Sequence, residues 1–197
     1  MKIQVCFTLP NNVDINNTVA WNSYKEIQDV ANISCVIVKG ASICINRNKC
    51  IIGNGPELIK QTGFAADKFL FIDYDISFNL DNICKLLKYN KDVISGTYLT
   101  RGGEICAGYW GKIDGLSEAT VNKDLNGLQK VDWIGAGFLM ISKEVLAKVE
   151  YPWFRPYIVT HDNRRSIISE DLGFCKYMKE NMVQPYLSMD CQVKHCI

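Results

Sequence analysis

The sequence predicts an α/β fold, in which a mostly parallel sheet is flanked by helices within a single domain. Short apolar runs alternate with segments of helical periodicity, which is typical of parallel sheets. Residues 69–72 are apolar without interruption, as expected of a strand that is buried on both faces. With 197 residues, of which 48% are hydrophobic, the chain is long enough to bury one substantial core.

The first forty residues supply a strand, a helix and a second strand. Residues 3–9 form an apolar strand that ends at Pro10, and residues 35–38 form another that ends at Gly40. Between them we expect a helix, because four residues fall roughly on one of its faces: Val19, Tyr24, Ile27 and Ala31. This order is the start of the alternation that predicts a parallel sheet.

The next part of the chain continues the alternation. Residues 46–63 are partly helical but are interrupted by glycines, and Pro56 suits the first turn of a helix that begins there. After the strand at 69–72, we expect a helix over 80–89 with three residues directed inward: Ile83, Leu86 and Leu87. Residues 92–96 form a further short buried strand.

The second half of the chain is less regular. Residues 103–130 are polar and rich in glycine, which favours edge strands or a flexible loop. Residues 138–141 form a strand that leads into a helix capped by Ser142. A last helix over 169–178 and a final strand around 186–187 complete the predicted domain.

Composition and charge exclude several functional classes. The formal net charge of +1 gives no electrostatic reason to expect a nucleic-acid partner. No apolar run approaches membrane-spanning length, and the N-terminus has no signal-peptide architecture. The nine cysteines are odd in number, and Cys6 and Cys35 lie in apolar, strand-like contexts typical of reduced, buried thiols. Because such thiols suit a reducing compartment, we expect a cytoplasmic protein with no membrane span.

Two carboxylates follow the buried strand at 69–72. Asp73 and Asp75 are separated by one residue, so strand geometry points them the same way. Ligands of open α/β sheets bind just beyond the carboxyl ends of such strands. Two carboxylates at such a position are costly unless a cation neutralises them. A divalent metal ion suits this role, because it prefers oxygen ligands and often shares its coordination shell with a phosphate. One aspartate is expected to hold the metal and the other a metal-bound water or a ribose hydroxyl; the alternative is a surface turn.

A glycine-containing segment follows Asp132-Trp133. Glycines at 135 and 137 allow the backbone to approach a ligand at a place where a Cβ atom would clash. The indole of Trp133 offers a flat apolar face to a sugar ring or a base. These residues predict a ligand site, and the alternative is a β-bulge or a tight entry into the following strand.

The last third of the chain adds two more candidates. Ser169-Glu170-Asp171 has the pattern of a helix N-cap with an acidic first turn, and a carboxylate in that turn is also able to face a cleft as a general base. His195 together with two carboxylates makes a reasonable set of ligands for a divalent metal. His161 lies in a polar loop and receives no role.

Taken in order, these segments resemble the GT-A fold of nucleotide-sugar glycosyltransferases, and the resemblance covers nearly the whole chain. Five elements in the family's order make it specific. They are the opening strand from Gln4 to Pro10, the segment Asn46-Arg47-Asn48, the Asp-x-Asp motif at Asp73-Tyr74-Asp75, the Gly-Ala-Gly segment from Asp132 to Phe138, and the Glu-Asp motif at Glu170-Asp171. His195 falls where such enzymes often have a late metal-binding histidine. The compact size is similar to that of viral glycosyltransferase domains that decorate capsid proteins.

The resemblance implies one GT-A domain over 1–197, with a nucleotide-binding part at about 1–96 and an acceptor-side part at about 97–197. It assigns the binding of the nucleotide-sugar to Thr8, Pro10, Arg47, Asp73, Tyr74, Gly135, Ala136 and Gly137. It assigns Mn²⁺ or Mg²⁺ to Asp73, Asp75 and His195. Asp171 is implied as the catalytic base, with Asp132 in reserve. The acceptor is expected to meet Trp110, Trp133, Trp153 and Glu170.

The expected activity is metal-dependent transfer of a sugar from a nucleoside-diphosphate sugar, by default a UDP-sugar, to a hydroxyl of a glycan or glycoprotein acceptor with inversion. A nucleotide- or carbohydrate-binding module without turnover is one alternative. A haloacid-dehalogenase-like phosphatase is another, but there Asp-x-Asp normally ends the first strand and is followed two residues later by Thr or Val, where this chain has Ser77. The chain departs from the family where Gly53 and Gly55-Pro56 interrupt the helix after Arg47. It also ends two residues after His195, so we allow for further domains of a longer polypeptide.

Overall fold

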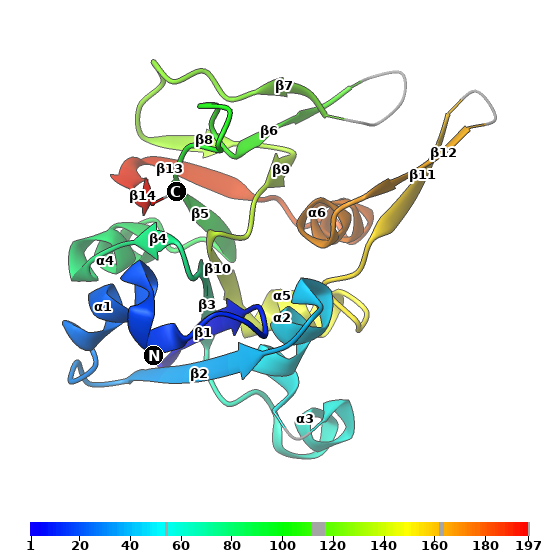
Figure 1. The fold of residues 1–197 in the computed structure, drawn as a ribbon. Helices are drawn as coiled ribbons and strands as arrows, with labels where there is room; N and C mark the ends of the chain where they lie inside the picture. Colours follow the sequence, from blue (N-terminus) through cyan, green and yellow to red (C-terminus); the bar gives the residue numbers. More distant parts are fainter. Residues whose placement is uncertain (54, 112–116, 162–163, 197) are drawn as a thin grey trace.

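A seven-stranded sheet runs through the centre of the molecule (Figure 1). The structure is a computed structural model and describes residues 1–53, 55–111, 117–161 and 164–196. In spatial order the strands are β2 (Ile33–Lys39), β1 (Ile3–Leu9), β3 (Lys68–Asp73), β10 (Phe138–Ser142), β5 (Val93–Thr97), β13 (Tyr186–Gln192) and β8 (Leu128–Lys130). All run in one direction except β10 and β8, which are antiparallel to their neighbours. The predicted mostly parallel sheet is confirmed.

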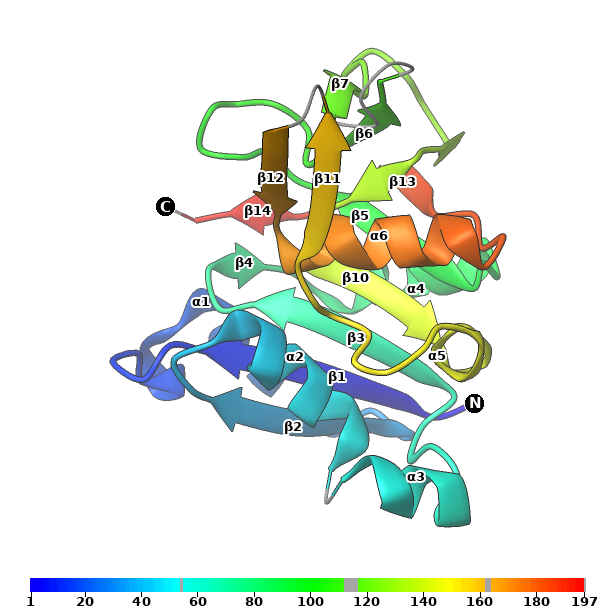
Figure 2. The same ribbon diagram turned by 90° about the vertical axis from the view of Figure 1, so that its right-hand side faces the viewer.

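Helices cover both faces of this sheet. Figure 2 shows α2 (Ile43–Ile52), α5 (Lys143–Lys148) and α6 (Glu170–Glu180) in front of it. The opposite face carries α1 (Val19–Lys25) and α4 (Leu80–Lys88), and a short helix, α3 (Pro56–Thr62), follows α2. Each face has its own apolar core, so side chains alternate between the two along every central strand.

Strand β3 shows why its sequence is apolar without interruption. Leu70 and Ile72 pack into the core beneath α1 and α4, whereas Phe69 and Phe71 pack into the core beneath α2, α5 and α6. All four side chains are at most 1% exposed. Between Lys68 at its start and Asp73 at its end, the strand has no solvent face.

Three smaller sheets are attached to this core. They pair β4 (Ile76–Ser77) with β14 (Lys194–His195), β6 (Ala107–Trp110) with β7 (Ser117–Thr120) and β9 (Trp133–Ile134), and β11 (Tyr157–His161) with β12 (Arg164–Ile168). The polar stretch at 103–130 therefore contains two strands of a small sheet, β6 and β7, and one edge strand of the central sheet, β8. The prediction of edge strands in this stretch is confirmed.

The β11–β12 hairpin, which projects from the body of the molecule in Figure 1, has no counterpart in the sequence interpretation. Residue 161 was expected in a polar loop but belongs to β11. Ile158 and Ile167 face each other across the hairpin yet are 59% and 75% exposed. Val159 is buried, but most of the described side chains of the two strands are exposed, so the hairpin has little of the buried apolar face on which strand prediction depends.

Two helix predictions need correction. The first helix was expected to reach Ala31 but ends at Lys25, and Ala31 is exposed beyond it. Ser142 occupies the N-cap position of α5, but its hydroxyl donates to Asp92 Oδ1 (3.1 Å) instead of accepting from the helix backbone. The helix over 80–88 is confirmed, with the three predicted side chains packed against the core.

No helix among the described residues has the length and apolar character needed to cross a bilayer. All nine cysteines are free thiols, and Cys6 is buried while Cys35 is half-buried. Burial raises the pKa of the Cys6 thiol well above its ordinary value. Cys6 therefore packs as a small, unreactive apolar residue, as the sequence predicts.

Candidate functional site

A pocket of about 260 Å³ lies at the carboxyl ends of β1, β2 and β3, and we call it the β1–β3 pocket. This is the edge at which open α/β sheets bind their ligands. Six of the residues assigned to the donor or its metal line it: Thr8, Pro10, Arg47, Asp73, Tyr74 and Asp75. Three segments far apart in the sequence thus meet at one sheet edge.

The wall of this pocket is tied together by Asn46, a residue for which the sequence interpretation had no role. Its amide Nδ2 donates to the carbonyl oxygens of Leu9 and Gly40, both at 3.2 Å, which joins the first turns of α2 to the ends of β1 and β2. A Cβ atom at Gly40 would lie 2.4 Å from Asn46 Oδ1. Glycine at position 40 therefore leaves the room that the Asn46 amide occupies when it bonds to both carbonyls.

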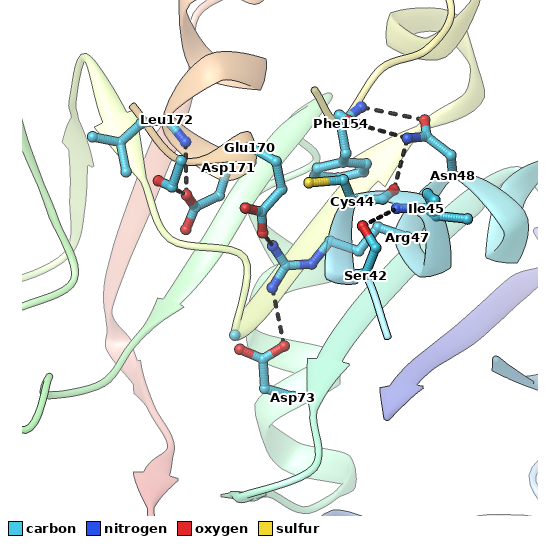
Figure 3. Close-up of polar contacts among 12 residues, drawn as sticks. Ser42, Cys44, Ile45, Arg47, Asn48, Asp73, Phe154, Glu170, Asp171 and Leu172 are labelled. Carbon is cyan, nitrogen blue, oxygen red and sulfur yellow. Dashed lines mark hydrogen bonds and ion pairs between the residues drawn. The ribbon is translucent and has the colours of Figure 1, made fainter. Parts of the chain in front are cut away.

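Arg47 lies at the centre of the site (Figure 3). Its Nη2 is 3.0 Å from Asp73 Oδ1, and its Nη1 forms a close ion pair with Glu170 Oε1. The side chain is only 4% exposed, and its Cζ lies 5.7 Å from the ring centre of Phe154. The helix that carries Arg47 is braced by Asn48, whose amide donates to Phe154 O (2.7 Å) and accepts from Phe154 N (3.3 Å).

The charges around Arg47 make it a permanent cation. Burial by itself lowers the pKa of the guanidinium, but Asp73, Asp171 and Glu170 together raise it above its ordinary value. Burial raises the pKa of Glu170, and this effect exceeds the opposite effect of Arg47. Arg47 was assigned to donor binding; it lines the pocket, but both of its terminal nitrogens already hold carboxylates.

The glycine interruption after Arg47 does not disturb this arrangement. Helix α2 continues to Ile52 before the chain turns at Gly53, which has φ of +54°. Arg47 and its neighbours therefore lie in the middle of an intact helix. The glycines at 53 and 55, where the sequence departs from the family pattern, belong to the connection from α2 to α3.

Asp171 lies in the first turn of α6, next to Glu170. Its Oδ1 accepts from the backbone N–H of Leu172 (2.8 Å) and from the hydroxyl of Ser169 (Figure 3). Ser169 therefore does not cap the helix backbone as expected; its hydroxyl binds the carboxylate instead. The predicted base is half-buried at the edge of the Arg47 network, and both of these hydrogen bonds use the same oxygen.

Asp75 and His195 meet although they are 120 residues apart. The Nε2 atom of His195 lies 3.1 Å from Asp75 Oδ2, and its Nδ1 lies 2.9 Å from the carbonyl oxygen of Leu99. The pairing of β4 with β14 and the hydrogen bond from Cys196 N to Asp75 O (2.7 Å) hold the two segments together. Because the Leu99 carbonyl only accepts, Nδ1 carries the hydrogen, as in histidines that bind a metal through Nε2.

The predicted metal set is only partly assembled. Asp73 faces Arg47, and the described residues contain no group of three metal-binding side chains. Asp75 and His195 fit a divalent cation as a pair, since neighbouring ligands at about 2.1 Å from an octahedral metal lie about 3 Å apart. A diphosphate would have to supply the remaining ligands.

Asp132, the reserve base, lies elsewhere. It accepts from the backbone N–H of Trp110 (3.0 Å) and lines a different pocket with Lys179 and Gln184. Lys179 is at the C-terminal end of α6, whereas Asp171 is at its start, and a helix rises about 1.5 Å per residue. The structure therefore does not bring Asp132 to the Arg47 network.

The three tryptophans assigned to the acceptor are packing residues, because each is buried. Trp110 and Trp133 are 6% and 7% exposed, with ring centres 6.4 Å apart. Trp153 is 4% exposed, and its Nε1 donates to the carbonyl oxygens of Leu146 and Val149 at the end of α5. A ring in such a position has no open face to offer a sugar.

The segment from Gly135 to Gly137 is buried, and protein rather than ligand explains its glycines. A Cβ atom at Gly135 would lie 2.3 Å from Cys106 Sγ and 2.4 Å from Tyr98 Oη, and one at Gly137 would lie 2.8 Å from Tyr98. The backbone N–H of Gly137 donates to Tyr98 Oη (2.9 Å), while its carbonyl accepts from Asp73 N (3.0 Å). Neither glycine, nor Ala136 between them, lines the β1–β3 pocket.

No protein-family model matches the chain, and no curated protein matches it in sequence. Solved structures do match in fold. The crystal structure of A197 from STIV aligns with a TM-score of 0.60 at 16% identity, covering 100% of this chain and 95% of that one. The crystal structure of GalNAc-T7 with UDP, GalNAc and Mn²⁺ aligns with a TM-score of 0.58 at 9% identity, covering 100% of this chain and 44% of that one. The chain thus has a GT-A-type fold, the fold that the sequence predicts.

Proposed function

We propose that this protein is a metal-dependent glycosyltransferase that transfers a sugar from a nucleoside-diphosphate sugar, by default a UDP-sugar, to a hydroxyl of a glycan or glycoprotein acceptor. The observation that carries the proposal is the β1–β3 pocket, in which Thr8, Asp73 and Asp75 meet Arg47 at the carboxyl edge of the sheet. The shared fold with GalNAc-T7, whose structure contains UDP, GalNAc and Mn²⁺, supports the donor and the metal.

The charge of the pocket supports a metal requirement. Two carboxylates, Asp73 and Asp75, and one guanidinium line it, and that guanidinium is shared with Glu170 outside the lining. A diphosphate that enters alone meets an excess of negative charge in a partly dehydrated site, where such repulsion is stronger than in bulk water. A divalent cation at Asp75 reverses the sign of that interaction.

Asp75 and His195 are the residues proposed to hold the cation. When bound, it supplies Lewis-acid stabilisation of the charge that develops on the leaving diphosphate. The bond to Leu99 O orients His195, and Asp73, held by Arg47, is proposed to accept a hydrogen bond from a ribose hydroxyl of the donor.

Asp171 is proposed to take the proton from the acceptor hydroxyl as it attacks. A hydroxyl is a poor nucleophile at neutral pH, and a carboxylate within hydrogen-bond reach assists by general-base catalysis. Glu170, held by Arg47, fixes the first turn of α6 and thus the carboxylate that follows. Because a base on the acceptor side activates the acceptor hydroxyl for direct attack on the sugar, we expect a single displacement that inverts the configuration of the anomeric carbon.

Donor binding tests the first part of this proposal. Calorimetry with UDP should show binding that depends on Mn²⁺, and Asp75→Ala should weaken it by more than about tenfold through loss of a ligand. Asp29→Ala, which removes an exposed carboxylate away from the pocket, is the matched control. Equal UDP affinity with and without Mn²⁺ in the wild-type protein would contradict the metal requirement.

Turnover tests the second part. Labelled UDP-sugars with Mn²⁺ should be hydrolysed slowly, or transferred when an acceptor is present, and Asp171→Asn should lower the rate by about 10²–10⁴-fold with donor binding intact. Full activity in that variant would exclude Asp171 as the base. Donor binding with no turnover would instead establish a binding module. A phosphatase mechanism is disfavoured because Asp73, the nucleophile it would need, is bound to Arg47.

We place the reaction in a reducing compartment, in line with the cytoplasmic expectation, because every cysteine of the chain is a free thiol.

A further inference from the structure

A second cavity lies on the other side of His195, and we call it the His195 cavity. Its volume is about 600 Å³, and its walls come from the chain after β5 and from the end of β13 with β14. The His195 ring lines this cavity and also contacts Asp75, which lines the β1–β3 pocket. A ligand in the His195 cavity would therefore lie beside the proposed cation and donor. Its volume is within the range of about 300–1,000 Å³ found for small-molecule sites.

The floor of this cavity is aliphatic. Its exposed apolar surface comes from Leu99, which is 45% exposed, and from the half-buried Val193, whereas the lining residues Ile105 and Met189 are only 2% and 5% exposed. Among the described apolar lining residues, the aromatic ring is that of Tyr98, which is only 8% exposed and whose hydroxyl accepts from the backbone N–H of Gly137. Sugars are commonly held by open aromatic faces, so this lining suits an aliphatic group better than a glycan.

The charged groups of the cavity are cationic. Lys123 and Lys194, both exposed, line it, and none of its described lining residues is acidic. Among the described residues, neither lysine takes part in an ion pair. An apolar cavity with unpaired ammonium groups favours a ligand that combines an aliphatic body with an anionic group.

The backbone of the cavity walls argues against a peptide ligand. Amide N–H groups on these segments are used within the protein, from Thr100 to Glu104 O (2.8 Å), from Cys106 to Tyr98 O (3.2 Å) and from Val193 to Thr97 O (2.9 Å). An extended peptide that binds to a sheet edge obtains its affinity from such groups. Because these N–H groups are already used, we expect a ligand of the cavity to be held through side-chain contacts, as an aliphatic chain would be.

We propose that the His195 cavity binds an aliphatic acid, and that this acid is the part of the acceptor that lies next to its reactive hydroxyl. The class is a chain of apolar carbons that bears a phosphate or a carboxylate. That the bound acid is part of the acceptor rests on the proposed function. This role narrows the proposed acceptors to glycans or hydroxyls that are carried on such a chain. The proposed class of ligand, by contrast, rests on the lining of the cavity alone.

Binding of octyl phosphate below its micelle concentration, without metal, tests the ligand class. We expect saturable binding in calorimetry, with octyl carboxylate as the second anionic arm and octyl glucoside, octyltrimethylammonium and inorganic phosphate binding at least about tenfold more weakly. Lys123→Glu should weaken octyl phosphate by about tenfold, because it reverses one charge at the cavity. Lys25→Glu, an exposed lysine on α1, is the control and should change nothing.

Leu99→Asn is a second variant at a part-exposed position and should weaken both anionic octyl ligands, octyl phosphate and octyl carboxylate, because their alkyl chains depend on the aliphatic floor. Octyl phosphate that fails to bind, or binds equally to wild type and to both cavity variants, overturns the proposal. Calorimetry of UDP with Mn²⁺ on the same samples separates the two hypotheses: donor binding without octyl phosphate binding refutes only the cavity, and the reverse refutes only the donor site.

Discussion

Replacing Arg47 with methionine should make the stability of this protein strongly dependent on pH. The substitution keeps most of the length and apolar stem of the side chain but removes the charge that holds two carboxylates. Arg47 is 4% exposed, and the side chain of Glu170 is 12% exposed, so this pair is buried. Asp73, at 34%, is able to regain water on its own.

The expected loss follows from that burial. Breaking a buried ion pair by removing one partner costs about 3–5 kcal/mol, because the remaining charge is left without compensation. Since Asp73 rehydrates and Glu170 carries most of the cost, we expect about 3 kcal/mol at pH 8, a large share of a total stability of about 5–15 kcal/mol.

The pH dependence has a definite sign. Burial already raises the pKa of Glu170 above its ordinary value, and loss of Arg47 removes the main influence that lowers it. A carboxyl whose pKa is higher in the folded than in the unfolded state stabilises the fold at low pH, and that contribution is lost as pH rises through the folded pKa. Arg47→Met should therefore be less destabilising at pH 5 than at pH 8.

Urea unfolding followed by tryptophan fluorescence at the two pH values measures this effect. Adding Glu170→Gln to Arg47→Met should recover at least half of the loss at pH 8, because the buried charge is then removed. Lys143→Met, which breaks the part-exposed pair with Asp67, is the control and should have a far smaller effect. A loss below about 1 kcal/mol that is the same at both pH values would refute the reasoning.

Two further predictions concern the fold around the site. Gly135→Ala should destabilise the protein by about 1–3 kcal/mol, because its Cβ atom would lie 2.3 Å from Cys106 Sγ, whereas Gly102→Ala, with its nearest contact at 3.6 Å, should be close to neutral in the same urea experiment. The pKa of Asp67 is lowered to about 2 by its bonds to Lys143 and the backbone, so its contribution to stability is complete above the unfolded pKa of about 4 and is lost as pH falls towards 2. Asp67→Asn should accordingly flatten the stability curve between those two pH values.

What could be predicted from the sequence is what local pattern encodes. The strand before Asp73 was recognisable because both faces of β3 are buried, and its position at a carboxyl edge followed from the fold class. The order of strands β10 and β13 in the sheet was not recognisable, because it depends on crossovers that no local periodicity records. The hairpin at 157–168 was missed for the related reason that its strands bury little.

The site was predicted residue by residue but not as a set of contacts. Arg47 was identified, yet its partners lie 26 and 123 residues away, so its use as a link between β3 and α6 had no signal in the sequence. Tyr98 had none either: it is a single tyrosine after a strand, and only the three-dimensional contact with Gly137 shows why the glycines are there. A glycine in a motif leaves room either for a ligand or for a buried side chain, and the sequence pattern is the same in both cases.

The two halves of the site therefore differ in how mutations should be interpreted. Arg47 and Glu170 are buried and join elements of the fold, so a loss of activity there mixes lost stability with lost chemistry. Asp75 and His195 are 20% and 18% exposed, and their contact lies at the short β4–β14 pairing and not in the apolar core. A defect of Asp75→Ala or His195→Ala in Mn²⁺-dependent UDP binding, with unfolding unchanged, is thus a direct measure of the proposed cation site, whereas the same defect in Arg47→Met is not.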